Sequence, residues 1–381
     1  MKSAIASLSW GNFLIGTGAF VVAGLTPYIA GELDVTIAAA GQLLTAYTLT
    51  YALTSPVLIT FTSGIERRVG LAAGLATFAA GNLIVAFSGS FAALCIGRIM
   101  TALGAALFSP LSYALAAELS PPEKRAQILS YVVMGLTLAN VVGLPLGTML
   151  GTFGSWRWAF AAVGVLGLAT AALLLVVLPR AQPGAPRSLA AVAEALGNGT
   201  VVALIGVSFL QYAALFVVFA YIAPVVTAGG AFDRLGIPWL LLLFGCGSVA
   251  GNLAGGWAAD RWGKTQVITA ALLALVPILA LFPIACGSIA AGSVDAVLWG
   301  FAGLAFMAPQ QHRVISIPGQ AAPVMLSLNV AAIYLGGAAG AALGGAVEHL
   351  GANAIGLAGA ALALLALALS SLVRPAPAAA N

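Results

Sequence analysis

Long apolar runs alternate with short polar connections along almost the whole chain of 381 residues. A run of about 20 apolar residues is long enough to cross a bilayer as a helix. The pattern predicts twelve such spans, at 10–29, 39–60, 70–87, 91–113, 128–150, 158–178, 201–221, 238–257, 265–285, 294–308, 324–347 and 352–372. The runs lack the two-residue alternation of barrel strands, so we expect an all-α membrane protein with twelve transmembrane helices.

Composition leaves little of the chain for a soluble domain. Hydrophobic residues make up 62% and charged residues only 6%, whereas soluble domains are about 25% charged. The first apolar run follows Lys2 and could be mistaken for a signal peptide. We interpret it as the first span, because no small-residue cleavage site followed by a soluble chain succeeds it.

The placement of the positive charges predicts the orientation of the chain. If both termini are cytoplasmic, the outer loops hold two basic residues, Arg157 and Arg234. The inner loops and ends then hold eleven: Lys2, Arg67, Arg68, Lys124, Arg125, Arg180, Arg187, Arg261, Lys264, Arg313 and Arg374. This is the bias of the positive-inside rule. The net charge of +4 therefore reflects the orientation of the chain in a lipid bilayer, which we expect to be its partner. The same placement argues against binding of nucleic acid.

A turn-rich linker divides the chain into two similar halves. The sequence predicts a six-helix bundle at 1–178, a cytoplasmic linker at 179–199 and a second six-helix bundle at 200–381. A basic loop follows the second span of each half, with Arg67 and Arg68 in one and Arg261 and Lys264 in the other. Such internal symmetry is typical of transporters with duplicated bundles and a binding site between them.

Glycines recur at four-residue spacing in three of the predicted spans. The rows are Gly143, Gly147 and Gly151; Gly247, Gly251 and Gly255; and Gly336, Gly340 and Gly344. Small residues at this spacing let helices approach closely in lipid. One row alone indicates a tight helix contact, whereas three rows favour a bundle whose halves move against each other. Pro145 lies within the first row and predicts a bend there.

Several motifs resemble those of the major facilitator superfamily. After the eighth span, Gly256, Asp260, Arg261, Gly263 and Lys264 match the spacing of its G-x-x-x-D-R-x-G-R/K loop. The counterpart after the second span, 63–68, is degenerate and has no Asp at the matching place. The resemblance covers essentially the whole chain and implies the major facilitator fold.

Further motifs place the chain near the twelve-span drug:proton antiporters of bacteria. Arg98 with Gly104 is similar to the R-x-x-x-x-x-G signature, and Gly143, Pro145 and Gly147 resemble a shortened antiporter motif. The stretches 40–43, 65–68 and 308–311 resemble the purine-base exporters, beside the arabinose-efflux-like and chloramphenicol-exporting branches. This resemblance implies a monomer in the inner membrane that exports small amphipathic or nucleobase-like molecules by alternating access, in exchange for protons.

The first span departs from this pattern at the position implied to bind a proton. Related exporters carry G-T-x-E-F, whereas this chain has Ala19 in place of the acidic residue. We also expect no acidic residue in the middle of a span, so the usual marker of a proton relay is absent. An uncoupled facilitator or an importer therefore remains open.

Arg98 is the only basic residue well inside a predicted span. Its burial costs about 2.5–3.5 kcal/mol on insertion scales. One interpretation is a cation that faces a cavity and contacts substrate; the other is an arginine that fixes helix ends through backbone carbonyls. Thr101 and Ser109 lie on the same helical stripe.

The resemblance implies that spans one, four, seven and ten line a central cavity. The candidate cavity residues are Asn12, Arg98, Thr101, Ser109, Gln211, Tyr212, Trp299 and Gln310. Each alone is better explained by helix packing, but together they suit a flat, partly polar ligand.

The candidate gating residues lie in the two cytoplasmic loops and in the fifth span. They are Asp260, Arg261, Gly263, Lys264, Arg67, Arg68, Gly143, Pro145 and Gly147. Asp260 and Arg261 could cap helix ends and bridge the halves in one conformational state only. The alternative is a solvated loop, which we favour for Arg67 and Arg68.

The remaining chemistry is sparse. The cysteines stand alone in apolar runs, and His312 and His349 have no partners at metal-ligand spacing, so we expect no metal or cofactor. The sequence has no ATP-binding G-x-x-x-x-G-K loop. A membrane-embedded enzyme would need clustered acids or histidines at a membrane face, and a channel would need a filter-like loop, so a transporter is preferred to both.

Overall fold

The computed structural model describes residues 2–61, 65–121, 124–180, 189–233, 236–317 and 322–373. All regular elements within these residues are helical. Arg187, Arg234, Arg374 and the linker residues 181–188 lie outside the described part.

The first half of the chain forms six spans. The first consists of α1 (Lys2–Phe20) and α2 (Val22–Leu33), which meet at an angle of 45°. The others are α3 (Ile37–Phe61), α4 (Arg67–Phe87), α5 (Phe91–Glu118), the continuous segment α6 (Arg125–Leu138), η2 (Ala139–Gly143) and α7 (Leu144–Phe153), and α8 (Trp156–Val177).

The second half forms another six. A short helix, α9 (Leu189–Leu196), precedes α10 (Gly199–Phe219), α11 (Ile222–Gly229), α12 (Gly236–Trp262), α13 (Lys264–Ala285), α14 (Ile289–Ala305), α15 (Met307–Ile315), α16 (Ala322–Val347), η3 (Glu348–Leu350) and α17 (Ala352–Leu372). Helix α10 is the seventh span, and α14 continues into α15 as the tenth.

The described helices confirm the twelve-span bundle. Ten segments are long and apolar enough to cross a membrane, and the bent pair α1 and α2 makes an eleventh. Helix α3 is not among these segments, but its 25 residues extend about 37 Å at 1.5 Å per residue. That length exceeds the roughly 30 Å hydrocarbon core of a bilayer.

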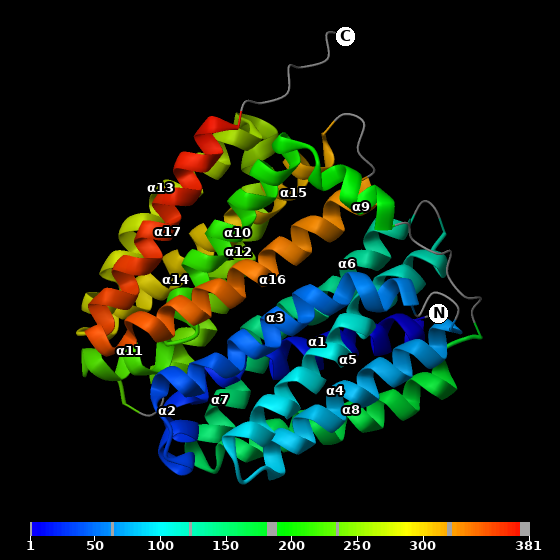
Figure 1. Ribbon diagram of the computed structural model, residues 1–381, viewed down its shortest axis with the longest axis horizontal. Coiled ribbons are helices and arrows are strands. Elements are labelled where there is room, and N and C mark those ends of the chain that lie inside the picture. The colour runs from blue at the N-terminus through cyan, green and yellow to red at the C-terminus, as the bar shows by residue number, and fades with distance from the viewer. Residues whose placement is uncertain are drawn as a thin grey trace. The chain divides into compact units, whose positions relative to one another are not determined.

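The chain divides into two compact units, and the same helix pairs recur in each. The first holds Met1–Arg187 with Ala220–Pro224 and Asp233–Leu242; the second holds Ser188–Phe219, Val225–Phe232 and Leu243–Asn381. In the first, α4 packs against α5 and α8, and α1 packs against α6. In the second, α13 packs against α14 and α17, and α10 packs against α16 (Figure 1). In each half, the third span thus packs against the fourth and the sixth, and the first packs against the fifth. These shared pairings are those of a pseudo-symmetric fold.

Two of the glycine rows hold helices together inside the second unit. A Cβ atom on Gly247, Gly251 or Gly255 would overlap backbone carbonyls on successive turns of α14. Gly336 and Gly340 stand in the same relation to carbonyls of α10. These rows therefore mark backbone-to-backbone packing, the interpretation that we gave to any single row.

Two spans differ in detail from the predicted pattern. The tenth begins at Ile289 instead of 294, because Ser293 interrupts the apolar residues at its start and hides its first turn. The fifth contains a π-helical turn before Pro145, in which Leu144 N–H donates to the Ala139 carbonyl. Proline has no N–H for the carbonyl four residues earlier, so the ladder is rearranged there.

Candidate functional site

The first span is interrupted at residues 17–21, which we call the junction. The final hydrogen bond of α1 runs from Val21 N–H to the Thr17 carbonyl, at 3.0 Å. The carbonyls of Gly18 and Ala19 follow it and lie at a helix C-terminus, where the helix itself supplies no donors. Buried carbonyls in this position need donors from another element.

Arg98 supplies those donors from α5. Its Nη1 donates to the Gly18 carbonyl at 2.7 Å and its Nη2 to the Ala19 carbonyl at 2.5 Å. Its Nε donates to the Leu43 carbonyl of α3 at 3.3 Å. The side chain is fully buried. This geometry favours the second interpretation of Arg98, as an arginine that fixes helix ends through backbone carbonyls.

An aromatic ring and position 19 complete the surroundings of Arg98. The guanidinium carbon lies 4.7 Å from the centre of the Tyr47 ring, within the range of a cation–π contact. The Tyr47 hydroxyl is buried and has no hydrogen-bond partner among the described residues. Because the chain has Ala19 where related exporters have an acid, position 19 offers Arg98 only its backbone oxygen.

The proline-containing segment of the fifth span packs against the same junction. A Cβ atom on Gly143 would overlap the Thr17 hydroxyl, and one on Gly147 would lie 2.7 Å from Val21 Cγ2. The structure thus brings together Arg98, Gly143 and Gly147, which are far apart in the sequence. Their common neighbour is the break in the first span.

The other candidates of the first unit make ordinary interhelical and local bonds. Asn12 Nδ2 donates to the Leu8 carbonyl at 3.0 Å and to Ser112 Oγ at 2.9 Å, which joins α1 to α5. Thr101 donates back to the Arg98 carbonyl at 2.7 Å. Ser109 is nearly buried on the same stripe.

A buried polar cluster lies in the second unit. Gln310 Nε2, on α15, donates to the Leu204 carbonyl at 2.8 Å and to Ser208 Oγ at 3.2 Å. Ser208 Oγ donates to Asn329 Oδ1 of α16 at 2.6 Å. Gln211 Nε2, one turn from Ser208 on α10, donates to the Gly303 carbonyl at 2.9 Å.

The two glutamines present unsatisfied acceptors. A carbonyl can only accept, so the bonds to Leu204 and Gly303 fix which end of each amide is the nitrogen. Oε1 of Gln211 and Oε1 of Gln310 are buried and have no partner among the described residues. The cluster therefore lacks hydrogen-bond donors.

Aromatic residues lie close to this cluster. Tyr212 donates its hydroxyl to the Met307 sulfur at 2.9 Å. The buried Trp299 ring lies 4.7 Å from Phe244 and 5.1 Å from Phe282, centre to centre. Its indole Nε1 is buried without a partner in the described chain.

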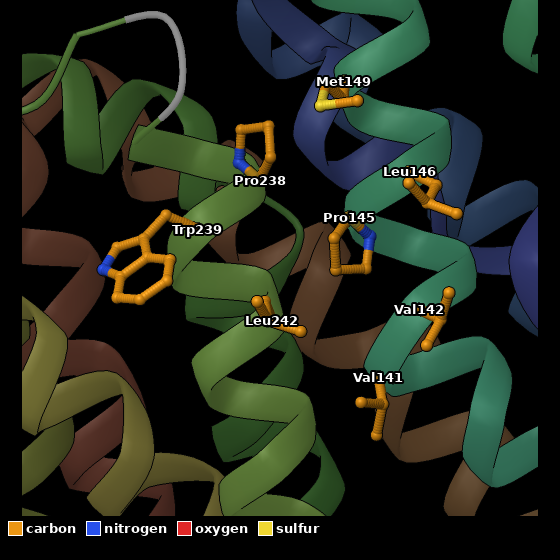
Figure 2. Close-up of a pocket in the computed structure, with 8 residues that line it drawn as sticks. All are labelled: Val141, Val142, Pro145, Leu146, Met149, Pro238, Trp239 and Leu242. Carbon is orange, nitrogen blue, oxygen red and sulfur yellow. The ribbon is translucent and has the colours of Figure 1, made fainter.

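An apolar groove borders Pro145 in the first unit (Figure 2). It has a volume of about 330 Å³ and is lined by Val141, Val142, Pro145, Leu146, Met149, Pro238, Trp239 and Leu242. The sequence did not indicate this groove, because the start of α12 is far from α7 along the chain. Its lining suits hydrocarbon.

The gating candidates near the connection of α12 to α13 and at the start of α4 differ in whether they are exposed or paired. Asp260 and Arg261 are exposed, and in the described part no hydrogen bond or ion pair involves either. Gly263 has φ +97°, which favours glycine, and Lys264 begins α13. Arg67, in contrast, pairs with Glu118 at 2.5 Å, and Arg68 donates to the Leu175 carbonyl.

Sequence reasoning missed Glu32 and part of the amide cluster. Glu32 accepts from Arg157 Nη2 at 2.8 Å and from Trp156 Nε1 at 2.6 Å, which ties α2 to α8. Ser208 and Asn329 could have been noticed as polar residues within apolar spans. Glu32 gave no such signal, since it lies beside a loop.

The arrangement suits binding rather than bond chemistry. Within the described residues no group of three or more His, Cys, Asp or Glu could hold a metal ion. The buried polar groups of the junction and of the amide cluster are amides, hydroxyls, indole and guanidinium, which donate and accept hydrogen bonds.

Comparison with known proteins identifies the family. The model of the Major Facilitator Superfamily matches residues 8–316. The inner membrane transport protein YdhP of Escherichia coli K12 is 34% identical over 96% of this chain and 94% of its own. The uncharacterized MFS-type transporter YbcL of Bacillus subtilis 168 is 28% identical over 95% and 93%.

Solved structures agree on the fold. A bacterial homolog of the human lysosomal transporter Spinster, inward-facing and occupied, has a TM-score of 0.77 at 17% identity over 99% of both chains. A D-xylose-proton symporter has a TM-score of 0.76 at 18% identity over 97% of both. The chain therefore belongs to the Major Facilitator Superfamily and is a multi-pass membrane transporter.

Proposed function

We propose that this transporter exports small amphipathic molecules, drug-like or nucleobase-like, across a bacterial inner membrane. It works as a monomer with both termini in the cytoplasm, by alternating access and in exchange for protons. Its whole-length similarity to an inner membrane transport protein supports the membrane assignment. One proton that enters down about 100 mV supplies about 2.3 kcal/mol.

The amide pair of the second unit carries the proposal on substrate. A buried acceptor without a donor costs about 1–3 kcal/mol, and both Gln211 Oε1 and Gln310 Oε1 are in this state. A ligand with N–H groups would satisfy them. Nucleobases and amine-containing drugs have such donors on flat, partly apolar bodies, which also suit the nearby aromatic rings.

The first test is a growth-protection screen. Cells that express the transporter are challenged with antibiotics and toxic base analogues, and radiolabelled adenine is then followed in counterflow with purified protein in liposomes. Protection together with adenine counterflow supports the proposal. The absence of adenine counterflow, together with the absence of protection from any compound, would contradict the proposal.

Substitution of Gln310 tests the role of the unsatisfied acceptor. We expect Gln310→Leu to weaken adenine binding by about tenfold, since about 1.4 kcal/mol corresponds to that factor. Gln310→Glu retains an acceptor oxygen and should bind better than the leucine variant. The matched control is Gln127→Leu, because Gln127 is exposed on α6 and its amide bonds only to Tyr131. Equal binding by Gln310→Leu and the control would remove Gln310 from the site.

An uncoupled facilitator is the second candidate. Ala19 favours it, because the first span has no carboxylate at the position that the related exporters use. A pH-sensitive dye inside the liposomes distinguishes the two, since a coupled exporter changes the internal pH when adenine is added and a facilitator does not.

A further inference from the structure

Asp295 lies within the tenth membrane span, five residues further from its start than the predicted span 294–308 indicated. It is the seventh residue of α14, which begins at Ile289, so it stands about 9 Å along the helix. Acidic residues at such positions are costly and mark ion or proton pathways. Neither the amide cluster nor the junction uses this residue.

Asp295 and Trp299 each have a buried polar atom without a hydrogen-bond partner among the described residues. These atoms are the carboxylate Oδ1 of Asp295 and the indole Nε1 of Trp299. The two residues are four apart on α14, so they share one face of the helix. Helical side chains lean toward the N-terminus, which inclines the indole of Trp299 toward Asp295.

Among the described residues the carboxylate has no fixed counter-charge. Cys286, directly after α13, contributes a thiol that interacts electrostatically with Asp295. The side chains that α10, α12 and α13 pack around Trp299 are Phe219, Phe244 and Phe282, which do not titrate. Within the described residues no ion pair involves Asp295. The group is only partly exposed.

We propose that Asp295 is the proton-binding residue of this transporter, and that Trp299 is its conditional partner. An incoming proton forms an O–H bond on the carboxylate and changes its charge from −1 to 0. In the deprotonated state the carboxylate accepts the Trp299 N–H, and protonation weakens that bond. Because Trp299 is also a candidate cavity residue, protonation of Asp295 changes a contact at the ligand site. This inference rests on the proposed exchange of substrate for protons.

The transport test compares Asp295→Asn with the wild type in adenine-loaded liposomes. Across a gradient of about one pH unit, exchange for one proton sustains about tenfold accumulation. Asp295→Asn should lose this accumulation while counterflow stays within about twofold of the wild type. Asp295→Glu should restore coupling. The control is Glu348→Gln, which also replaces a carboxylate with an amide, at a residue just before α17. This variant should accumulate adenine like the wild type.

A second readout needs no substrate. Infrared difference spectra between acidic and alkaline buffer should show the C=O stretch of a protonated acid, which Asp295→Asn removes and Trp299→Phe shifts. A wild-type band in Asp295→Asn, wild-type accumulation by that variant, or no substrate-linked proton flux in the wild type would overturn the inference. If no adenine counterflow occurs at all, the proposed substrate is wrong, and the infrared band still decides whether Asp295 takes up the proton.

Discussion

A buried arginine in a bilayer needs acceptors in place of water, and Arg98 obtains three backbone carbonyls and one aromatic face. Two of those carbonyls exist as free acceptors only because the first span breaks at the junction. The arginine and the break therefore stabilise each other. The polar residue in one apolar span and the break in the neighbouring span therefore form a single structural feature.

Substitution of Arg98 should affect both stability and transport. Arg98→Ala leaves the Gly18 and Ala19 carbonyls unsatisfied, at about 1–3 kcal/mol each, and should lower the melting temperature of the purified protein by several degrees. Arg98→Lys should recover only part of the lost melting temperature, because an ammonium group lacks the planar, forked arrangement of donors that reaches two carbonyls. We expect adenine counterflow to be abolished or uncoupled from proton flux.

The control for Arg98 is Arg125→Ala, at an exposed residue that donates to the Ala117 carbonyl. It should leave both melting temperature and counterflow close to the wild type. Unchanged transport by a folded Arg98→Ala protein would remove Arg98 from the mechanism and leave it a structural residue.

At the scale of elements, close backbone packing sets which helices belong together. The glycines of α12 lie against consecutive turns of α14 and those of α16 against α10, so each row commits two helices to one unit. In lipid, where the hydrophobic effect does not drive helices together, such close approach is a main source of association. Stability in each unit should therefore be sensitive to single added methyl groups.

Two alanine substitutions on α12 test this sensitivity. A Cβ atom on Gly251 would overlap the Phe301 carbonyl oxygen, whereas one on Gly256 has its nearest neighbour, Ala308 Cβ, at 3.8 Å. Gly251→Ala should destabilise the protein by about 1–3 kcal/mol, the usual effect of overpacking. Gly256→Ala should be neutral. Melting temperatures in detergent compare the pair, and equal values would contradict close packing of α12 on α14.

At the scale of the molecule, hydropathy and motifs predicted the twelve spans and the family, because both depend on local composition. They did not predict the break at Val21. The residues around it form one apolar run, and the donor that stabilises the break is Arg98, about 80 positions away. The acceptors of Gln211 and Gln310 were unpredictable for a similar reason, since carbonyls on other helices orient the amides. Asp295 escaped notice because it is the second residue of the predicted span 294–308, whereas the helix begins at Ile289.

The last turn of α12, which holds Asp260 and Arg261 where the sequence predicted a loop, is the candidate for control of the conformational cycle. Asp260 is exposed and, in the described residues, unpaired, so its removal should not change the melting temperature. If its carboxylate joins helix ends in another state, Asp260→Asn should slow adenine counterflow by about five- to tenfold, the size of a modest coupling free energy. Glu194→Gln, on the exposed face of α9, controls for the loss of one exposed negative charge. A wild-type rate for Asp260→Asn would assign this turn of α12 to membrane orientation alone, whereas a slower rate at unchanged stability requires a contact that forms during the cycle.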